Sequence, residues 1–224
     1  MKRIALVSVV VFLAAAPALA QTARPWISAN TAFGWYDPTD VNRQVQELRD
    51  EIEFAMDDVS SGFQLGAAAG LELSNGWTVG GGYQRLYAST QGSTGALKVE
   101  YDVPADVIHL FGRYTFQRTG ATRSFAEGSL GFLSTDGRIR SSFADETHTF
   151  ALEGTGWSLE GSFGFERRLT PALAVTACVG GRKAKALDVT GDGVRLSTPR
   201  GDEFVVDYSG VFLRAALQAT YPRH

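Results

Sequence analysis

The sequence predicts an all-β fold, a single eight-stranded antiparallel β-barrel with a short helix in its first long connection. Three observations predict it. Polar and apolar residues alternate with period two in eight segments, as in strands with two unlike faces. Tight turns and long connections alternate between these segments. Finally, no run after residue 20 approaches the ~18 apolar residues of a membrane-spanning helix.

The first twenty residues are set apart from this pattern. Two basic residues precede an uncharged apolar run over 4–16, and a small-x-small triplet ends at Ala20. This is the order of a cleaved signal peptide. A membrane anchor is the alternative, but the run is short for a span and no stop-transfer pattern follows. We therefore expect a signal peptide over 1–20 and one domain over 21–224.

Composition excludes several classes of protein. The 224 residues are 44% hydrophobic and 11% aromatic, which excludes a disordered chain. The formal net charge of −3 has no basic excess, so we expect no nucleic-acid partner. One cysteine excludes a disulfide framework and a zinc site built from cysteines. We expect no cofactor and no metal.

The expected strands run in order over 26–36, 62–74, 77–88, 106–118, 123–134, 153–169, 173–187 and 206–221. Tight turns join them at 74–76, 119–121 and 170–172, and long connections lie at 37–61, 89–105, 135–152 and 188–205. Consecutive strands joined by tight turns pair antiparallel. Short turns at one end and long loops at the other are typical of outer-membrane barrels, where the short turns are periplasmic.

The residue composition of the two strand faces indicates which face contacts lipid. A soluble barrel, such as a lipocalin-like ligand carrier, would show the same alternation with its faces reversed. Its water-facing side would be rich in Lys, Glu and Thr, whereas the less apolar face here is mostly Gly, Ala and Ser. Small residues suit the crowded interior of a narrow barrel. The apolar face carries aromatic residues such as Trp35, Trp77 and Trp157 near strand ends, as interfacial belts do.

The last strand is the most regular and supports a resemblance to a known family. Val211, Leu213, Ala215, Leu217, Ala219 and Tyr221 share its apolar face. The chain resembles the small outer-membrane β-barrel proteins of the OmpA, OmpX and OmpW type over the signal peptide and the rest of its length. The resemblance implies an outer-membrane location in a Gram-negative-type envelope and contact with outer-membrane lipid. It also implies that the barrel-assembly machinery reads Leu217, Ala219 and Tyr221, although the family usually ends on the aromatic residue and this chain adds three more.

Charges on the inward face are expected to pair across strands. A hairpin symmetric about residue 120 places Arg113 opposite Glu127, and one symmetric about 171 places Glu160 opposite Arg182. Opposite charges on facing strands stabilise the pairing, and buried charges need partners. Glu72 and Arg214 are further lumen charges without an assigned partner. We expect structural ion pairs filling a closed core, because eight strands leave an interior that side chains fill; a gate in a narrow channel is the alternative.

The first long connection is expected to contain a helix over 41–56. Asp40 is a suitable cap, and Val41, Val45, Leu48, Ile52, Ala55 and Met56 form one apolar stripe. The stripe is expected to pack against the barrel rim; a lid over the mouth or a partner-binding helix is the alternative.

Signals for catalysis are thin. His109 is expected within the lumen, and His148 within a long loop that also holds Ser142, Asp145 and Glu146. Proximity in sequence does not make a triad, which is defined by geometry. Asp188, Thr190 and Asp192 begin like a calcium loop, but Pro199 stands where an EF-hand has Glu, so a turn is expected. Cys178 is expected to be a small packing residue.

The sequence therefore predicts a transmembrane β-barrel that is not an enzyme and has a structural or surface-interaction role, with its long loops as a variable surface. The alternatives are a narrow channel, or a transporter of small hydrophobic solutes.

Overall fold

The computed structural model describes residues 23–36, 39–52, 55–95, 97–116, 120–143, 146–197 and 203–221. Eight antiparallel strands close a ring, which confirms the predicted fold class. In ring order these are β1 (Arg24–Tyr36), β3 (Ser61–Glu72), β4 (Trp77–Leu86), β7 (Ala105–Thr115), β8 (Thr122–Phe143), β9 (Glu146–Arg168), β10 (Leu173–Gly191) and β13 (Gly210–Thr220). The ring closes where β1 pairs with β13, from Trp26 opposite Thr220 to Tyr36 opposite Gly210.

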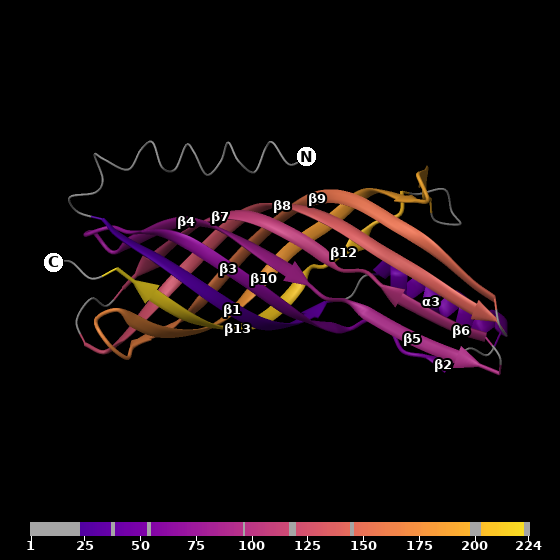
Figure 1. Ribbon diagram of the computed structural model, residues 1–224, viewed down its shortest axis with the longest axis horizontal. Coiled ribbons are helices and arrows are strands. Elements are labelled where there is room, and N and C mark those ends of the chain that lie inside the picture. The colour runs from indigo at the N-terminus through magenta and orange to yellow at the C-terminus, as the bar shows by residue number, and fades with distance from the viewer. Residues whose placement is uncertain are drawn as a thin grey trace.

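Beyond the ring, β8, β9 and β10 continue at the long-loop end as a curved sheet, here called the extension (Figure 1). Short strands add to it: β5 (Ser89–Thr94), β6 (Leu97–Asp102) and β2 (Ala55–Met56) beside β8, and β11 (Val194–Arg195) and β12 (Val206–Asp207) beside β10. The expected loop over 135–152 is therefore wrong. The β8–β9 ladder runs without interruption to Phe143 opposite Glu146. The expected loop over 89–105 is likewise a hairpin of β5 and β6.

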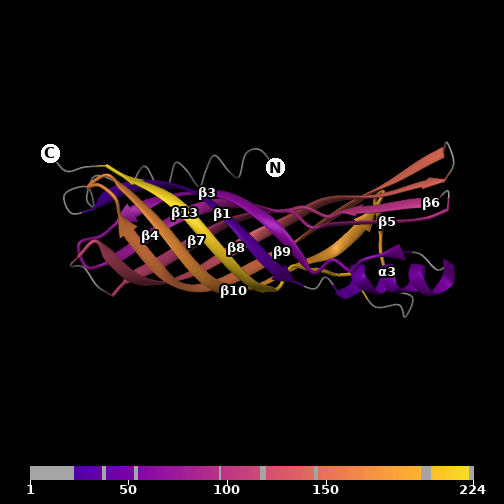
Figure 2. The same cartoon turned by 90° about the horizontal axis from the view of Figure 1, so that it is seen from below.

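The helix of the first connection is α3 (Thr39–Ile52), and it lies across the extension from β5 and β6 (Figure 2). The strands β1, β3 and β13 end where the ring ends and do not continue into the extension. The helix α3 lies on the side of the extension above these three strands. The helix was expected to reach residue 56, but it ends at Ile52. Ala55 and Met56 instead pair with Ser93 and Gly92 of β5. Among the described residues, no helix is long and apolar enough to cross a membrane.

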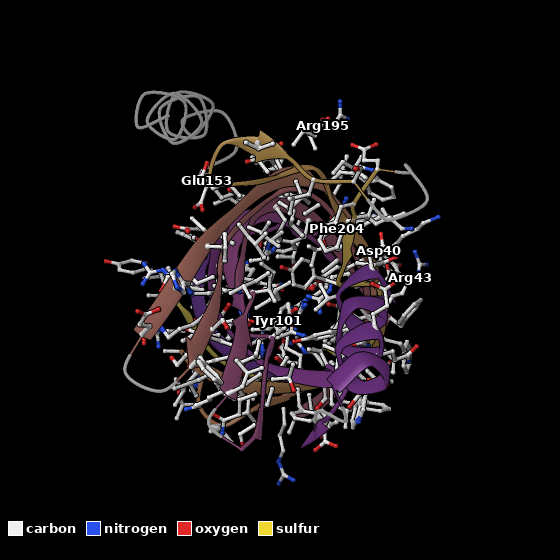
Figure 3. All side chains as sticks on the ribbon, turned by 90° about the vertical axis from the view of Figure 1, so that its right-hand side faces the viewer. Asp40, Arg43, Tyr101, Glu153, Arg195 and Phe204 are labelled. Carbon is white, nitrogen blue, oxygen red and sulfur yellow. The ribbon has the colours of Figure 1, made fainter. Side chains whose placement is uncertain are left out.

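An apolar cluster fills the interior from the top of the ring into the extension, and we call it the extension core. Its members share burial and an inward direction; they include Tyr36, Val41, Val45, Leu86, Tyr101, Leu133, Leu152, Phe204, Val206 and Tyr208. Seen from the long-loop end, α3 stands beside this interior, in which Tyr101 and Phe204 lie (Figure 3). Two residues of the predicted helical stripe, Val41 and Val45, are buried here. The side chains of Leu48 and Ile52 lie outside the described part of the chain.

Candidate functional site

The first charged pair of the lumen joins β7 and β8. Arg113 lies directly opposite Glu127, and its Nη2 is 2.7 Å from Glu127 Oε2, while its Nε donates to the same oxygen at 2.8 Å. The β7–β8 register is symmetric about residue 120, as expected for a hairpin that reverses there. The two side chains therefore meet as the turn position predicts.

The second pair joins β9 and β10. Glu160 lies opposite Arg182, with Arg182 Nη1 at 3.2 Å from Glu160 Oε1 and side chains that are 1% exposed for Arg182 and 5% for Glu160. Arg182 also donates to Tyr208 O and to Gln64 Oε1, each at 3.3 Å. A buried carboxylate–guanidinium pair needs such additional hydrogen bonds to offset its desolvation.

Arg214 of β13 joins the two pairs into one network. Its Nη1 lies 3.4 Å from Glu127 Oε1, and its Nη2 donates to Glu160 Oε2. The central network thus comprises Arg113, Glu127, Arg214, Glu160 and Arg182. Hairpin symmetry could not find the partners of Arg214, because β13 does not neighbour β8 or β9 and the contact crosses the lumen. The alternation of residues along the last strand indicated only that Arg214 faces the lumen.

The central network carries three arginines against two glutamates, and aromatic rings and amides surround the excess charge. Arg113 Cζ lies 4.3 Å from the ring centre of Phe125, and Arg214 Cζ lies 4.5 Å from that of Phe212. Cations are stabilised over aromatic faces. Gln218 Oε1 accepts a further hydrogen bond from Arg113 at 3.3 Å. The five charged side chains come from β7, β8, β9, β10 and β13, so the central network joins five strands across the interior.

Glu72, the other lumen charge without an expected partner, lies near the short-turn end. Its Oε1 is 3.1 Å from Arg168 Nη2 and 3.6 Å from Arg123 Nη1. Glu166 Oε1 accepts from Arg168 Nε at 3.4 Å. A second charged layer therefore lies between the central network and the short turns.

On the long-loop side of the central network, the interior becomes apolar. Tyr208 is fully buried there, and its hydroxyl contacts Val103 O and Thr135 Oγ1, each at 3.0 Å. The extension core surrounds it. The interior therefore changes along the barrel axis from ion pairs to a core like that of a soluble protein.

An ion-pair cluster links β10 and β11 to Glu203, which precedes β12. Arg195 Nη2 lies 2.6 Å from Asp188 Oδ1 and 2.9 Å from Glu203 Oε1. Glu203 also accepts the backbone N–H of Asp188 at 2.9 Å, and these two donors lower the pKa of the Glu203 carboxyl. Asp192 accepts the backbone N–H of Ala151 at 3.0 Å. The expected turn over this segment is therefore wrong in part, because Asp188 to Gly191 belong to β10 and only Asp192 and Gly193 form a turn.

The two internal histidines lie far apart. His109 is buried in the lumen opposite Gly131, whereas His148 is exposed on β9 opposite Ser141, much further along β8. Asp145 lies outside the described residues. Cys178 is a free thiol on the inner face of β10, opposite Gly164 and Arg214. In the described part of the chain, no group of His, Cys, Asp and Glu side chains could hold a metal ion.

The outward face of the ring is a broad apolar surface. Its exposed members include Ile27, Phe33, Trp35, Phe63, Trp77, Ile108, Leu110, Leu130, Phe132, Trp157, Leu159, Phe163, Leu213, Leu217 and Tyr221. Soluble monomers rarely expose a patch of this extent. Two further aromatic residues, Phe143 and Phe150, are exposed on the extension.

A family model and several solved structures match this chain. The family model described as outer membrane protein beta-barrel domain matches residues 5–209. No curated protein matches the sequence. Neisserial surface protein A is 14% identical, with 88% of this chain and 97% of that chain covered and a TM-score of 0.49. Ail, the attachment invasion locus protein of Yersinia pestis, is 13% identical in its complex with the heparin analogue sucrose octasulfate, with 89% and 99% covered and a TM-score of 0.45. A major outer membrane protein from Thermus thermophilus is 13% identical, with 88% and 99% covered and a TM-score of 0.46.

Proposed function

Because the chain belongs to the family of outer membrane protein β-barrel domains, we propose that it is a non-conducting barrel that presents a folded extension at the cell surface. The family places the chain in an outer membrane and its apolar outward face against lipid. The finer role proposed here is structural and interactive, and it is not catalytic.

The interior contacts support a closed lumen. The central network crosses the ring with the Glu160–Arg182 pair at its most buried point. The extension core then fills the interior between this network and the long-loop end. An aqueous path would have to pass both layers, and narrow eight-stranded barrels have interiors that side chains fill.

The single observation that carries a surface role is the continuation of β8 and β9 beyond the ring as an ordered hairpin. Phe143 and Phe150 lie on this hairpin with exposed fractions of 64% and 51%. Exposed aromatic residues outside a lipid-facing surface are typical of interaction sites. The extension is thus a paired sheet that exposes aromatic side chains, rather than a set of loops without strands.

The proposed role also requires export by a signal peptide and insertion by the barrel-assembly machinery. The expected signal peptide lies in residues outside the described part of the chain. Leu217, Ala219 and Tyr221 face outward from β13 and its end, so they are accessible for recognition by the barrel-assembly machinery before the ring closes.

Single-channel recording on the refolded protein in planar bilayers tests the closed lumen. We expect no conductance steps above the bare bilayer. Reproducible steps would instead favour the narrow-channel alternative.

Labelling of whole cells with a membrane-impermeant maleimide tests the orientation. In a Cys178→Ser background, Thr149→Cys on the extension is expected to react on intact cells. Asn75→Cys, in the short turn before β4, is the matched control and should react only after permeabilisation. The reverse pattern would contradict the proposed orientation.

A further inference from the structure

The central network contains one more cation than it has carboxylates. Arg113, Arg182 and Arg214 face only Glu127 and Glu160, and all five side chains are at most 11% exposed. Arginine stays protonated in proteins, so the excess positive charge is permanent. A buried charge without a counter-charge is costly, because the interior screens it far less than water does. The aromatic faces and neutral amides around the network reduce this cost but leave the net charge of one.

Neither neighbouring layer of the described interior supplies the missing negative charge. The layer towards the short turns contains Glu72, Glu166, Arg123 and Arg168, so its charges balance one another. Towards the long-loop end, the described interior is the apolar extension core. The excess charge must therefore be met within the central network itself.

Arg214 has one hydrogen-bond donor to spare within this network. Its Nη1 and Nη2 contact Glu127 and Glu160, whereas its Nε is buried and has no hydrogen-bond partner among the described residues. A buried guanidinium N–H without an acceptor is unusual, and it indicates an acceptor that is not part of the protein. A water molecule could accept this hydrogen bond, but only an anion also balances the charge.

The structure leaves room beside this donor. Arg214 and Glu127 lie inside the ring, yet 10% and 11% of their side-chain surface remains accessible. The residues opposite Arg214 on the two neighbouring strands are small, Ala32 on β1 and Cys178 on β10. The thiol of Cys178 is a second, weaker donor on the same inner face.

Buried side chains close this space along the barrel axis. Phe212 and Gln64 lie towards the long-loop end, and Phe125 and Gln218 lie towards the short turns; each is at most 6% exposed. An enclosed space of this kind suits a small inorganic anion and excludes an organic anion or a lipid headgroup.

We propose that the lumen holds one monovalent anion of the size of chloride, bound at Arg214 Nε within the central network. One negative charge makes the charges of the network equal, and the anion accepts the spare N–H in a charge-assisted hydrogen bond. The lumen core is then three arginines, two glutamates and one ion. This inference concerns a resident ion and goes beyond the proposed roles of the closed lumen and the extension.

Urea unfolding of the refolded full-length protein tests for the anion. Sodium chloride is exchanged for sodium gluconate at constant ionic strength, because gluconate is too large for the enclosed space. An anion that binds only the folded barrel lowers the unfolding constant about tenfold for each tenfold rise in chloride above its dissociation constant. Equal unfolding constants in the two salts at every chloride concentration would overturn the proposal.

Two lumen variants test the assignment to the central network. Arg214→Met removes both the spare donor and the excess charge, whereas Arg182→Met removes the excess charge alone. Both should lose the dependence on chloride, because an anion beside a balanced network would itself lack a counter-charge. Arg140→Met, at an exposed position of the extension, is the matched control and should keep the dependence. Chloride dependence in either folded lumen variant would contradict the assignment.

Crystals of the unaltered protein grown in sodium bromide give a readout that does not require any variant to fold. Bromide has the same charge as chloride and a similar size, and it can be located by its anomalous scattering. We expect an anomalous peak inside the ring beside Arg214 Nε. Bromide peaks confined to the protein surface would overturn the proposal.

Discussion

Asn42 and Val59 are joined by two hydrogen bonds between one side chain and one backbone residue. Asn42 Oδ1 accepts the N–H of Val59 at 2.8 Å, and Asn42 Nδ2 donates to the carbonyl of Val59 at 3.0 Å. Both residues are buried. A single helical side chain therefore satisfies both polar groups of a backbone unit that no strand pairs. Together with Asp40, whose Oδ2 accepts the N–H of Val205 at 3.0 Å, it fixes α3 to two separate segments.

Asn42→Ala should lower the free energy of unfolding by about 1–3 kcal/mol, because it leaves a buried N–H and a buried carbonyl unpaired. Alanine is the better helix former, so intrinsic helix propensity opposes this loss. Urea titration of the refolded protein measures the change. Gln46→Ala, on the exposed face of the same helix, is the control and should be neutral or slightly stabilising. An equal response from both variants would show that the two hydrogen bonds contribute nothing.

Glu160→Gln should destabilise the barrel more than Arg182→Met. Glu160 is shared by Arg182 and Arg214, so its loss leaves three arginines with one carboxylate, a change worth about 3–5 kcal/mol for a buried pair. Arg182→Met leaves Glu160 paired with Arg214 and balances the central network. It removes the hydrogen bonds to Tyr208 and Gln64, at a cost of about 1–2 kcal/mol. Urea unfolding of both variants gives the order.

The double variant Glu160→Gln with Arg182→Met should lose less stability than the sum of the single losses, since it removes the buried arginine that Glu160→Gln alone leaves without its carboxylate. Glu100 and Arg140 are the matched control, because they lie 3.4 Å apart on the extension but are 36% and 48% exposed. The corresponding cycle there should be additive within a few tenths of a kcal/mol. Additivity at Glu160 and Arg182 would mean that the two side chains do not interact.

Local sequence patterns predict the ring of this fold but not the extension. The ring can be predicted because lipid on one side of each strand and a crowded lumen on the other impose a strict alternation of residue types. Tight turns also fix the register of neighbouring strands. Residues 135–152 lack that alternation: Arg138 and Arg140 face water, and their inward neighbours Gly137 and Ile139 give only a weak apolar signal. The pairing of these residues depends on partners supplied by β6 and β9, which no local pattern contains.

The end of α3 and the partners of Arg214 were missed for the same reason. Ala55 and Met56 continue the helical stripe arithmetically, yet a strand partner in β5 takes them. Arg214 reaches Glu127 and Glu160 across the lumen, where the distance depends on closure of the whole ring. Such contacts are set by tertiary structure rather than by spacing along the chain.

Leu213→Arg and Phe150→Arg should differ in cost although the two side chains are almost equally exposed, at 52% and 51%. Leu213 lies on the apolar wall of the ring, where a cation costs about 2–4 kcal/mol near the bilayer midplane. Phe150 lies on the extension, where water can solvate the arginine, and surface substitutions usually change stability by less than about 0.5 kcal/mol. Urea unfolding of protein refolded into lipid vesicles compares them. A greater loss of stability for Phe150→Arg would show that the extension, rather than the ring wall at Leu213, lies in the membrane.

Replacing residues 40–52 with a Gly-Ser linker of the same length should leave a folded ring but a less stable protein. The ring should persist because β1 keeps its registered partners β13 and β3, so unheated samples should still migrate as a compact barrel in electrophoresis. Stability should fall because Val41 and Val45 leave the extension core and expose Leu86, Leu133 and Tyr208. The loss of two buried valines corresponds to about 3 kcal/mol or more by apolar burial alone, and binding of a hydrophobic dye should rise. The double change Gln46→Ser with Glu47→Ser, confined to exposed positions, controls for altered helix propensity and should not raise dye binding.

The central network lies below α3 and does not include it, so planar-bilayer recording should still show no conductance. Conductance steps after the replacement would show instead that α3 is the seal of a narrow channel, and that the ion pairs beneath it leave an open path.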